Sequence, residues 1–169
     1  MKGMIRLAII LFVVCALAAG SLALVNEVTR EPIAEQARRE TDVALRAVAP
    51  DATEFRATDD TTWDALDDGR SVGGVRAVKA KGYSGPIRLV VGTDTEGRIT
   101  GVRVISQTET PGLGTKVATD TFLDQFRGKA SSEVRLKKDD PAGTIDAVTA
   151  ATISSRAVVQ ALRQALGGE

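Results

Sequence analysis

The chain has 169 residues and a mass of 17.8 kDa, which is enough for one folded domain and a short additional segment. Its 22 basic and 22 acidic residues give a formal net charge of zero, so no strong positive field favours binding to nucleic acid. It contains one cysteine and no histidine, which excludes an internal disulfide, a zinc or iron–sulfur ligand set and an imidazole base. We therefore expect no metal site, and any redox chemistry must come from an organic cofactor.

An uncharged apolar run extends from Leu7 to Asn26. About 20 apolar residues are what a helix needs to cross a membrane, so we expect a transmembrane helix over 7–26 after a short N-terminal segment, 1–6. Lys2 and Arg6 precede the run and Glu27 follows it. The positive-inside rule then predicts a single-pass protein of the cytoplasmic (inner) membrane, with its N-terminus in the cytoplasm and its C-terminal domain outside.

Two alternatives concern the same apolar run. A cleavable signal peptide is the first, because Ala16-Leu17-Ala18 has the small-x-small pattern of a cleavage site. The apolar stretch is, however, longer than the usual signal-peptide core. A lipid anchor on Cys15 is the second, but Val14 stands where that motif needs a small residue. We expect Cys15 to be an ordinary free cysteine within the membrane helix.

The next segment, 27–50, is predicted to be a connecting helix, because Ile33, Ala37 and Val48 recur near a helical period and Pro50 ends the pattern. We expect the extracytoplasmic domain to occupy 51–169. Its first part, 51–74, is polar and is predicted to be irregular, with few large apolar anchors. Trp63 in this part is expected to pack into the core.

Three strands are predicted over 72–81, 87–93 and 99–106, all rich in valine and isoleucine. The last two are joined by 94–97, where Gly97 can adopt a positive φ, and the first two are joined by a turn at 82–86. These strands form an antiparallel meander. A tight loop over 109–114, a short helix over 120–126 and a final amphipathic helix ending at Gly167-Gly168 complete an α+β fold in which helices flank an antiparallel sheet.

Four hydroxyl side chains gather where the final helix is expected to begin, namely those of Thr149, Thr152, Ser154 and Ser155. The unpaired amides and the positive dipole end of a helix N-terminus favour an anion such as a phosphate. The simpler interpretation is that one hydroxyl only caps the helix.

Two separated stretches, GYSGPIRLVVGTDTEGRITGVRVISQTETPGLGTKV and IDAVTAATISSRAVVQAL, resemble the FMN-binding domain of the G subunit of the Rnf electron transport complex. More distantly they resemble the C subunit of Na+-translocating NADH:quinone reductase. The similarity covers 82–162, nearly half of the chain. It implies that FMN is joined covalently, by a phosphoester, to the threonine that ends a D-x-x-[ST]-G-A-T motif, and that a separate flavin transferase makes the bond.

Aligned with that motif, Thr152 is the FMN acceptor, Asp146 holds the acidic position and Thr149 the Ser/Thr position. Ala150 stands where the family usually has glycine, and Ala151 follows it. Because Ala150 has a Cβ, we expect a negative φ there. The resemblance also places the loop over 109–114 against the flavin, so its cofactor-binding candidates are Glu109, Thr110, Gly112, Leu113 and Gly114. Lys116 and Lys129 are further candidates for a phosphate contact.

The resemblance implies a membrane-anchored flavoprotein subunit that relays electrons through FMN, next to flavin and iron–sulfur subunits of an ion-motive complex. The chain itself is not expected to pump ions, because it has a single uncharged span. One alternative is a membrane-anchored FMN-binding sensor or regulatory module outside any electron relay, and copurification with multispan partners would distinguish the two. Another is a structural tether without a cofactor.

Overall fold

The computed structural model describes residues 2–168 of the chain, which divides into two compact units, one ending at Glu40 and one starting at Thr41. Helix α1 (Lys2–Val48) passes through both units. It is long and apolar enough to cross a membrane, with a mean hydropathy of 2.8 in its most apolar 18-residue window, and the side chains of that window are exposed. This helix contains the apolar run that predicts a membrane span.

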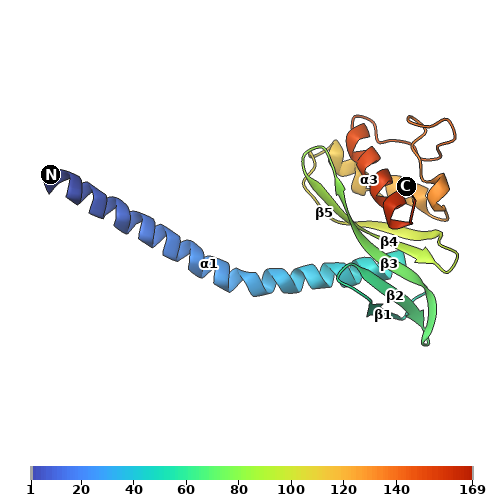
Figure 1. The fold of residues 1–169 in the computed structure, drawn as a ribbon, viewed down its shortest axis with the longest axis horizontal. Helices are drawn as coiled ribbons and strands as arrows, with labels where there is room; N and C mark the ends of the chain where they lie inside the picture. Colours follow the sequence, from blue (N-terminus) through green and yellow to red (C-terminus); the bar gives the residue numbers. More distant parts are fainter. Residues whose placement is uncertain (1, 169) are drawn as a thin grey trace. The chain divides into compact units, whose positions relative to one another are not determined.

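The second unit is built on a five-stranded antiparallel sheet in the order β1-β2-β3-β4-β5 (Figure 1). Each strand pairs with its neighbours in sequence, so the sheet is a simple meander. The strands are β1 (Glu54–Ala57), β2 (Thr62–Asp67), β3 (Arg70–Lys81), β4 (Pro86–Asp94) and β5 (Ile99–Gln107). The three strands predicted over 72–106 are confirmed, and Gly97 has the expected positive φ of 76°.

The prediction that 51–74 is irregular is wrong, because this segment forms β1, β2 and the start of β3. β1 and β2 are mostly exposed and polar on one face, which hides the apolar alternation of the other. On that other face Ala65 is buried, and Trp63 and Phe55 pack against the same cluster. A two-residue turn joins β2 to β3, with positive φ at Asp68 (48°) and Gly69 (76°), which is a type I′ hairpin.

One face of the sheet is covered by the last turns of α1. Ala44, Leu45 and Val48 are buried there against Val75 and Val90 of the sheet. Two cross-strand partners, Gly92 and Gly101, make this approach possible. A Cβ at either position would lie within 3.0 Å of backbone atoms of Val48, so the glycines form a notch that seats the helix end.

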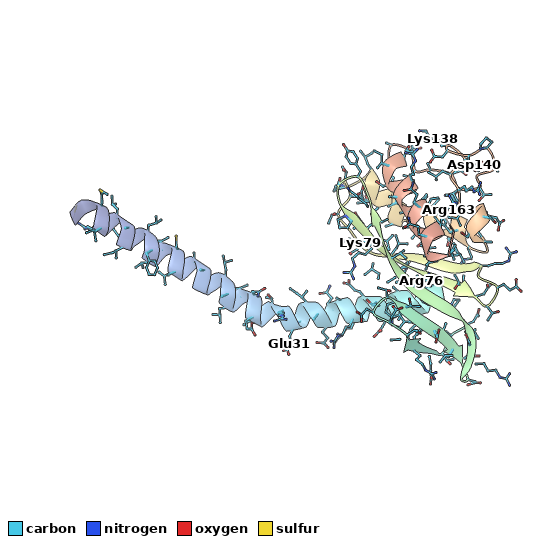
Figure 2. All side chains as sticks on the ribbon, viewed as in Figure 1. Glu31, Arg76, Lys79, Lys138, Asp140 and Arg163 are labelled. Atoms are coloured by element: carbon cyan, nitrogen blue, oxygen red, sulfur yellow. The ribbon has the colours of Figure 1, made fainter. Side chains whose placement is uncertain are left out.

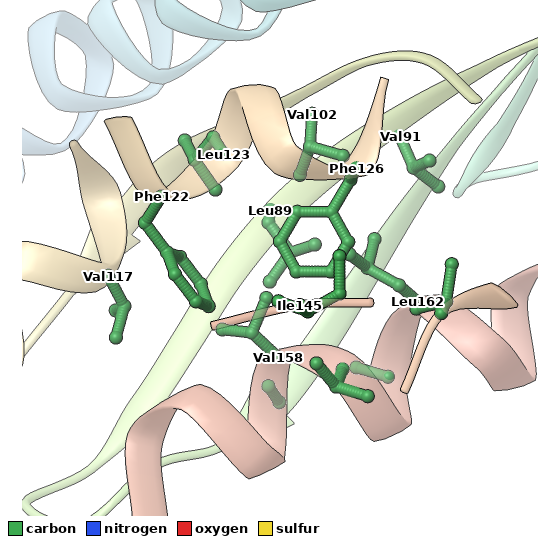
Figure 3. Packing of buried hydrophobic residues seen from close by; sticks show 14 of the residues in the cluster. Leu89, Val91, Val102, Val117, Phe122, Leu123, Phe126, Ile145, Val158 and Leu162 are labelled. Atoms are coloured by element: carbon green, nitrogen blue, oxygen red, sulfur yellow. The ribbon is translucent and has the colours of Figure 1, made fainter. Parts of the chain in front are cut away.

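The opposite face carries the larger core, which is covered by short helical segments and by α3 (Thr152–Ala165) (Figure 3). The segments before α3 are η1 (Gly114–Ala118), α2 (Asp120–Leu123), η2 (Asp124–Phe126) and η3 (Ser131–Glu133). The rings of Phe122 and Phe126 meet edge to face, with centroids 5.3 Å apart. This packing fixes α3, and with it the residues of its first turn, against the sheet.

Candidate functional site

A cavity of about 330 Å³ lies where the loop after β5 meets the N-terminal end of α3. It is lined mainly by apolar atoms and backbone, from two stretches about 40 residues apart in the sequence and from the turn between β3 and β4. Its lining residues are Tyr83, Glu109, Thr110, Leu113, Gly114, Ala150, Ala151, Thr152, Ile153 and Ser154. The structure therefore brings together the two stretches that the sequence singles out.

Glu109 holds these stretches together from within, because its side chain is buried, with 5% exposure. Its Oε2 accepts a hydrogen bond of 2.6 Å from Oγ of Ser154, and its Oε1 accepts one of 3.0 Å from the backbone N–H of Ser84. Both carboxylate oxygens of Glu109 therefore accept a hydrogen bond from another residue of the chain. Glu109 therefore links three segments: its own loop after β5, the first turn of α3 and the turn between β3 and β4. Its buried carboxylate already has hydrogen-bond partners within the chain.

The two glycines of the loop serve different purposes. Gly112 has a φ of 76° and open space around it, so the turn itself requires glycine there. Its N–H donates to Oγ1 of Thr115 at 3.0 Å, and it does not line the cavity. A Cβ on Gly114 would lie 2.5 Å from Oε2 of Glu109. Glycine is therefore needed at position 114, because a larger side chain would clash with the buried carboxylate of Glu109.

The first turn of α3 presents its hydroxyls in three different ways. Ser154 bonds Glu109, while Oγ of Ser155 accepts from the N–H of Val148 and donates to the carbonyl of Ala151. Thr152 is half-buried and lines the cavity. The N-cap residue is Ala151, which makes no side-chain capping bond. Thr152 is therefore not a capping residue, and it is the first residue of a 14-residue helix, at the positive end of the helix dipole.

One cation lies beside this hydroxyl, since Nζ of Lys138 is 3.5 Å from Oγ1 of Thr152. Asp139, the next residue, accepts two hydrogen bonds from Arg156 of α3, at 2.6 and 2.7 Å. These bonds lower the pKa of the Asp139 carboxyl and raise the pKa of the Arg156 guanidinium. Arg156 is four residues after Thr152, on the same side of the helix. The pair therefore fixes the Lys138 loop over the start of α3.

Ala150 contradicts the expectation of a negative φ, because its φ is 63°. The only other residue besides glycine with a positive φ in the described range 2–168 is Asp68. The left-handed conformation costs an L-residue with a Cβ roughly 1–2 kcal/mol, which explains why glycine suits this position. The chain accepts the conformation because two nearby residues, Val148 before it and Ala151 after it, are held by hydrogen bonds to Ser155.

The other candidates from the sequence lie at varying distances from the cavity. Thr110 and Leu113 line it, whereas Asp146 and Thr149 do not. The carboxylate of Asp146 instead forms an exposed ion pair of 2.7 Å with Lys137. Neither Lys116 nor Lys129 lines the cavity.

Three further residues at the site were not predicted from the sequence. Tyr83 and Ile153 line the cavity, and Lys138 contacts Thr152. Tyr83 and Ile153 belong to the two stretches that carry the resemblance, although neither is a motif position. Lys138 lies outside both stretches, and only the packing of the chain brings it to the site.

Comparison with known proteins matches residues 82–167 to the family described as FMN-binding domain and residues 1–48 to the RnfG N-terminal region. The chain is 32% identical to the G subunit of the Na+-translocating ferredoxin:NAD+ oxidoreductase complex of Acetobacterium woodii, over 98% of this chain and 91% of the relative. The chain belongs to the RnfG family of FMN-binding-domain proteins. A second RnfG relative, the G subunit of the ion-translocating oxidoreductase complex of Shewanella amazonensis, is 31% identical over 98% of this chain and 87% of the relative.

Solved structures support the fold of this RnfG chain. NqrC of Shewanella oneidensis matches with a TM-score of 0.53 and 29% identity, over 63% of this chain and 54% of that one. The C subunit of the Na+-translocating NADH-quinone reductase of Parabacteroides distasonis matches with a TM-score of 0.53 and 28% identity, over 63% of this chain and 59% of that one. The predicted fold class, an antiparallel sheet with helices after an N-terminal apolar helix, is confirmed.

The cavity fits the chemistry of FMN, the cofactor for which the matched domain family is named. An isoalloxazine ring needs apolar surface, and Leu113 and Ile153 at the cavity are 46% and 52% exposed, available for contact. A phosphate needs hydrogen-bond donors and positive charge. The first turn of α3 and Lys138 provide both beside the Thr152 hydroxyl.

Proposed function

We propose that this chain is the membrane-anchored flavoprotein subunit of an Rnf-type ion-motive electron transport complex, with FMN joined through its phosphate to Oγ1 of Thr152. The observation that carries the proposal is the position of that hydroxyl. It lines the cavity that both family motifs build, it caps nothing, and it lies 3.5 Å from Nζ of Lys138. A threonine so placed suits attachment of a phosphorylated ligand.

Attachment requires a phosphoanhydride donor, because FMN itself carries an unactivated phosphate monoester. We infer that a flavin transferase supplies a flavin dinucleotide. Oγ1 of Thr152 forms a bond to the flavin-bearing phosphorus, the P–O–P bond breaks, and a nucleoside monophosphate leaves. The hydroxyl proton of Thr152 passes to a base of the transferase. The product is a phosphodiester with one negative charge, and no electrons are transferred in this step.

Once bound, FMN supplies one- and two-electron transfer. The residues of this chain hold and orient it. Leu113 and Ile153 offer apolar surface, Thr152 fixes the phosphate, and Glu109 keeps the two walls of the cavity together. A covalent bond keeps the cofactor in place whatever its affinity, because the tether maintains a high effective concentration. This matters most in a compartment where free FMN is scarce.

We further infer that α1 anchors the chain in the cytoplasmic membrane, with the domain from Thr41 onward on the outer side. Lys2 and Arg6 before the apolar run support this orientation. The relatives are named as subunits of ion-translocating oxidoreductase complexes. The partners of this chain are accordingly the other subunits of such a complex, and its role is to relay electrons between their flavin and iron–sulfur centres.

The proposal is tested by expressing the full chain with a flavin transferase and viewing the denatured protein band under ultraviolet light. Wild type and the control Thr95→Ala are expected to fluoresce, and Thr152→Ala is expected to be dark. Thr95 is a suitable control because it is an exposed threonine in the turn between β4 and β5 and lies outside the cavity and both motifs. A dark wild-type band, under conditions that label a known acceptor, would contradict covalent attachment and favour a cofactor-free tether or a noncovalent binder.

A further inference from the structure

The Lys138 side chain forms no direct ion pair with a carboxylate within residues 2–168, although two carboxylates follow it in sequence. Asp139 is bonded to Arg156 and Asp140 to Arg135, at 2.6–2.7 Å. In this described part of the chain, the Lys138 ammonium group makes its one polar contact with the Thr152 hydroxyl, which is neutral. The Asp139 carboxylate attracts this ammonium group only weakly and without a direct ion pair, since its hydrogen bonds go to Arg156. An anion carried by the Thr152 hydroxyl would give Lys138 a partner in direct contact.

We propose that Lys138 is the phosphate-binding residue of this site, pairing with the phosphodiester that forms on Thr152. The inference rests on the proposed function. Attachment at Oγ1 introduces one negative charge next to Nζ, and a lysine ammonium donates charge-assisted hydrogen bonds to phosphate oxygens. Thr152 is also the first residue of α3, and the positive end of the helix dipole adds to this attraction.

The loop that carries Lys138 is fixed in advance of any ligand. Asp139 and Arg156 form a bidentate pair, which has a defined geometry. In addition, the backbone N–H groups of Asp139 and Asp140 both bond the carbonyl of Leu136, a buried core residue. Asp139 and Arg156 are therefore positioning residues, and the ammonium group of Lys138 is the one that contacts the phosphate.

This assignment predicts that the charge of Lys138 controls flavin loading. The full chain is expressed with a flavin transferase as wild type, Lys138→Ala, Lys138→Arg and Lys79→Ala. Lys79 is the matched control, since it is a lysine on β3 that lies well away from Lys138 (Figure 2). We expect the initial loading rate of Lys138→Ala to fall about tenfold, as for loss of a charge-assisted hydrogen bond. Lys79→Ala and Lys138→Arg should stay within about threefold of wild type.

A slower loading rate could arise either from lost phosphate binding or from weaker recognition of the chain by the transferase. The melting temperatures of the loaded and unloaded forms are therefore measured as well. Flavin fluorescence follows only the loaded molecules, and Trp63, the one tryptophan of the chain, follows unfolding of unloaded protein. In wild type and Lys79→Ala the loaded form should melt at a higher temperature. In Lys138→Ala this difference should shrink, while the unloaded protein melts as wild type does, because Lys138 is exposed.

The outcomes separate the assignment of Lys138 from the proposed function. If the wild-type band is dark, the proposed function fails. If wild type loads and Lys138→Ala loads at the same rate, or if Lys138→Ala keeps the full melting difference between loaded and unloaded forms, the assignment of Lys138 is wrong and the proposed function stands.

Discussion

The hydroxyl of Ser154 lies 2.6 Å from Oε2 of Glu109, and both residues are buried. This bond joins the first turn of α3 to the loop after β5, across 45 residues of sequence. Since Glu109 also accepts from the backbone of Ser84, the carboxylate ties three segments around the cavity. The shape of the site therefore depends on a pair of residues that need not contact the ligand.

Breaking this bond is expected to destabilise the fold. Ser154→Ala leaves one carboxylate oxygen of Glu109 buried without its partner, so the free energy of unfolding should fall by about 1–3 kcal/mol. Glu109→Gln should cost less, because an amide can still accept from Ser84 and donate to Ser154. Denaturant unfolding of both variants and the double variant measures the coupling. Ser106→Ala, at an exposed position, is the control. An equal loss of unfolding free energy in Ser154→Ala and Ser106→Ala would contradict the stabilising role of the Ser154–Glu109 hydrogen bond.

Ala150→Gly is expected to stabilise the protein, although most replacements of alanine by glycine do the opposite. The φ of 63° at Ala150 is strained for a residue with a Cβ. Relief of that strain outweighs the added freedom of the unfolded chain, for a net gain of up to about 1 kcal/mol. Ala57→Gly, on β1 with no such strain, should instead lose about 0.5–1 kcal/mol. Thermal melts compare the two, and losses of the same sign would argue against the left-handed conformation.

The Asp139–Arg156 pair gives a defined pH dependence. The pKa of Asp139 lies below its usual 3.8, chiefly because it accepts hydrogen bonds from Arg156. A carboxylate with a lowered folded-state pKa stabilises the fold above its unfolded pKa and loses that contribution as the pH falls through the folded value. Asp139→Asn should therefore lower Tm at pH 7 by about 1–2 °C, as for an exposed pair. The difference should vanish well below pH 3.8. Asp42→Asn is the control for an exposed carboxylate outside this pair, and an equal loss of Tm in both variants would contradict the role of the pair.

The last turns of α1 are needed by the folded unit. A fragment of residues 41–169 retains Ala44, Leu45 and Val48, which are buried against the sheet. A fragment of residues 51–169 lacks them and should be less stable by at least about 3 kcal/mol, from two large apolar side chains alone. Urea unfolding followed by Trp63 fluorescence compares the two. Equal stability would show that the α1 end is dispensable.

The sequence supports some features of this fold better than others. The strands over 72–106 are rich in β-branched residues and could be predicted, and so could the turn at Gly97. β1 and β2 could not be found by apolar content, but the Asp68-Gly69 pair is a hairpin signal in the sequence that points to them. Their polar outer face made them look irregular.

Some residues of the site could likewise be predicted from the sequence, and others could not. The resemblance to the FMN-binding domain led to Thr152 and to the loop over 109–114, because both of its motifs can be recognised in the sequence. The burial of Glu109 and the contact of Lys138 with Thr152 arise only when distant segments pack. The left-handed φ of Ala150 was missed because its side chain argues against it, and neighbouring hydrogen bonds impose it.

Attachment of FMN to Thr152 is tested most directly by tandem mass spectrometry of the tryptic peptide 139–156 from protein loaded by a flavin transferase. This peptide carries five hydroxyl residues, Thr144, Thr149, Thr152, Ser154 and Ser155, so fragmentation locates the modified one. Attachment through the phosphate predicts one FMN, added with loss of one water, on Thr152. A flavin on another hydroxyl of the peptide, or an unmodified peptide from protein that was exposed to an active transferase, would contradict it.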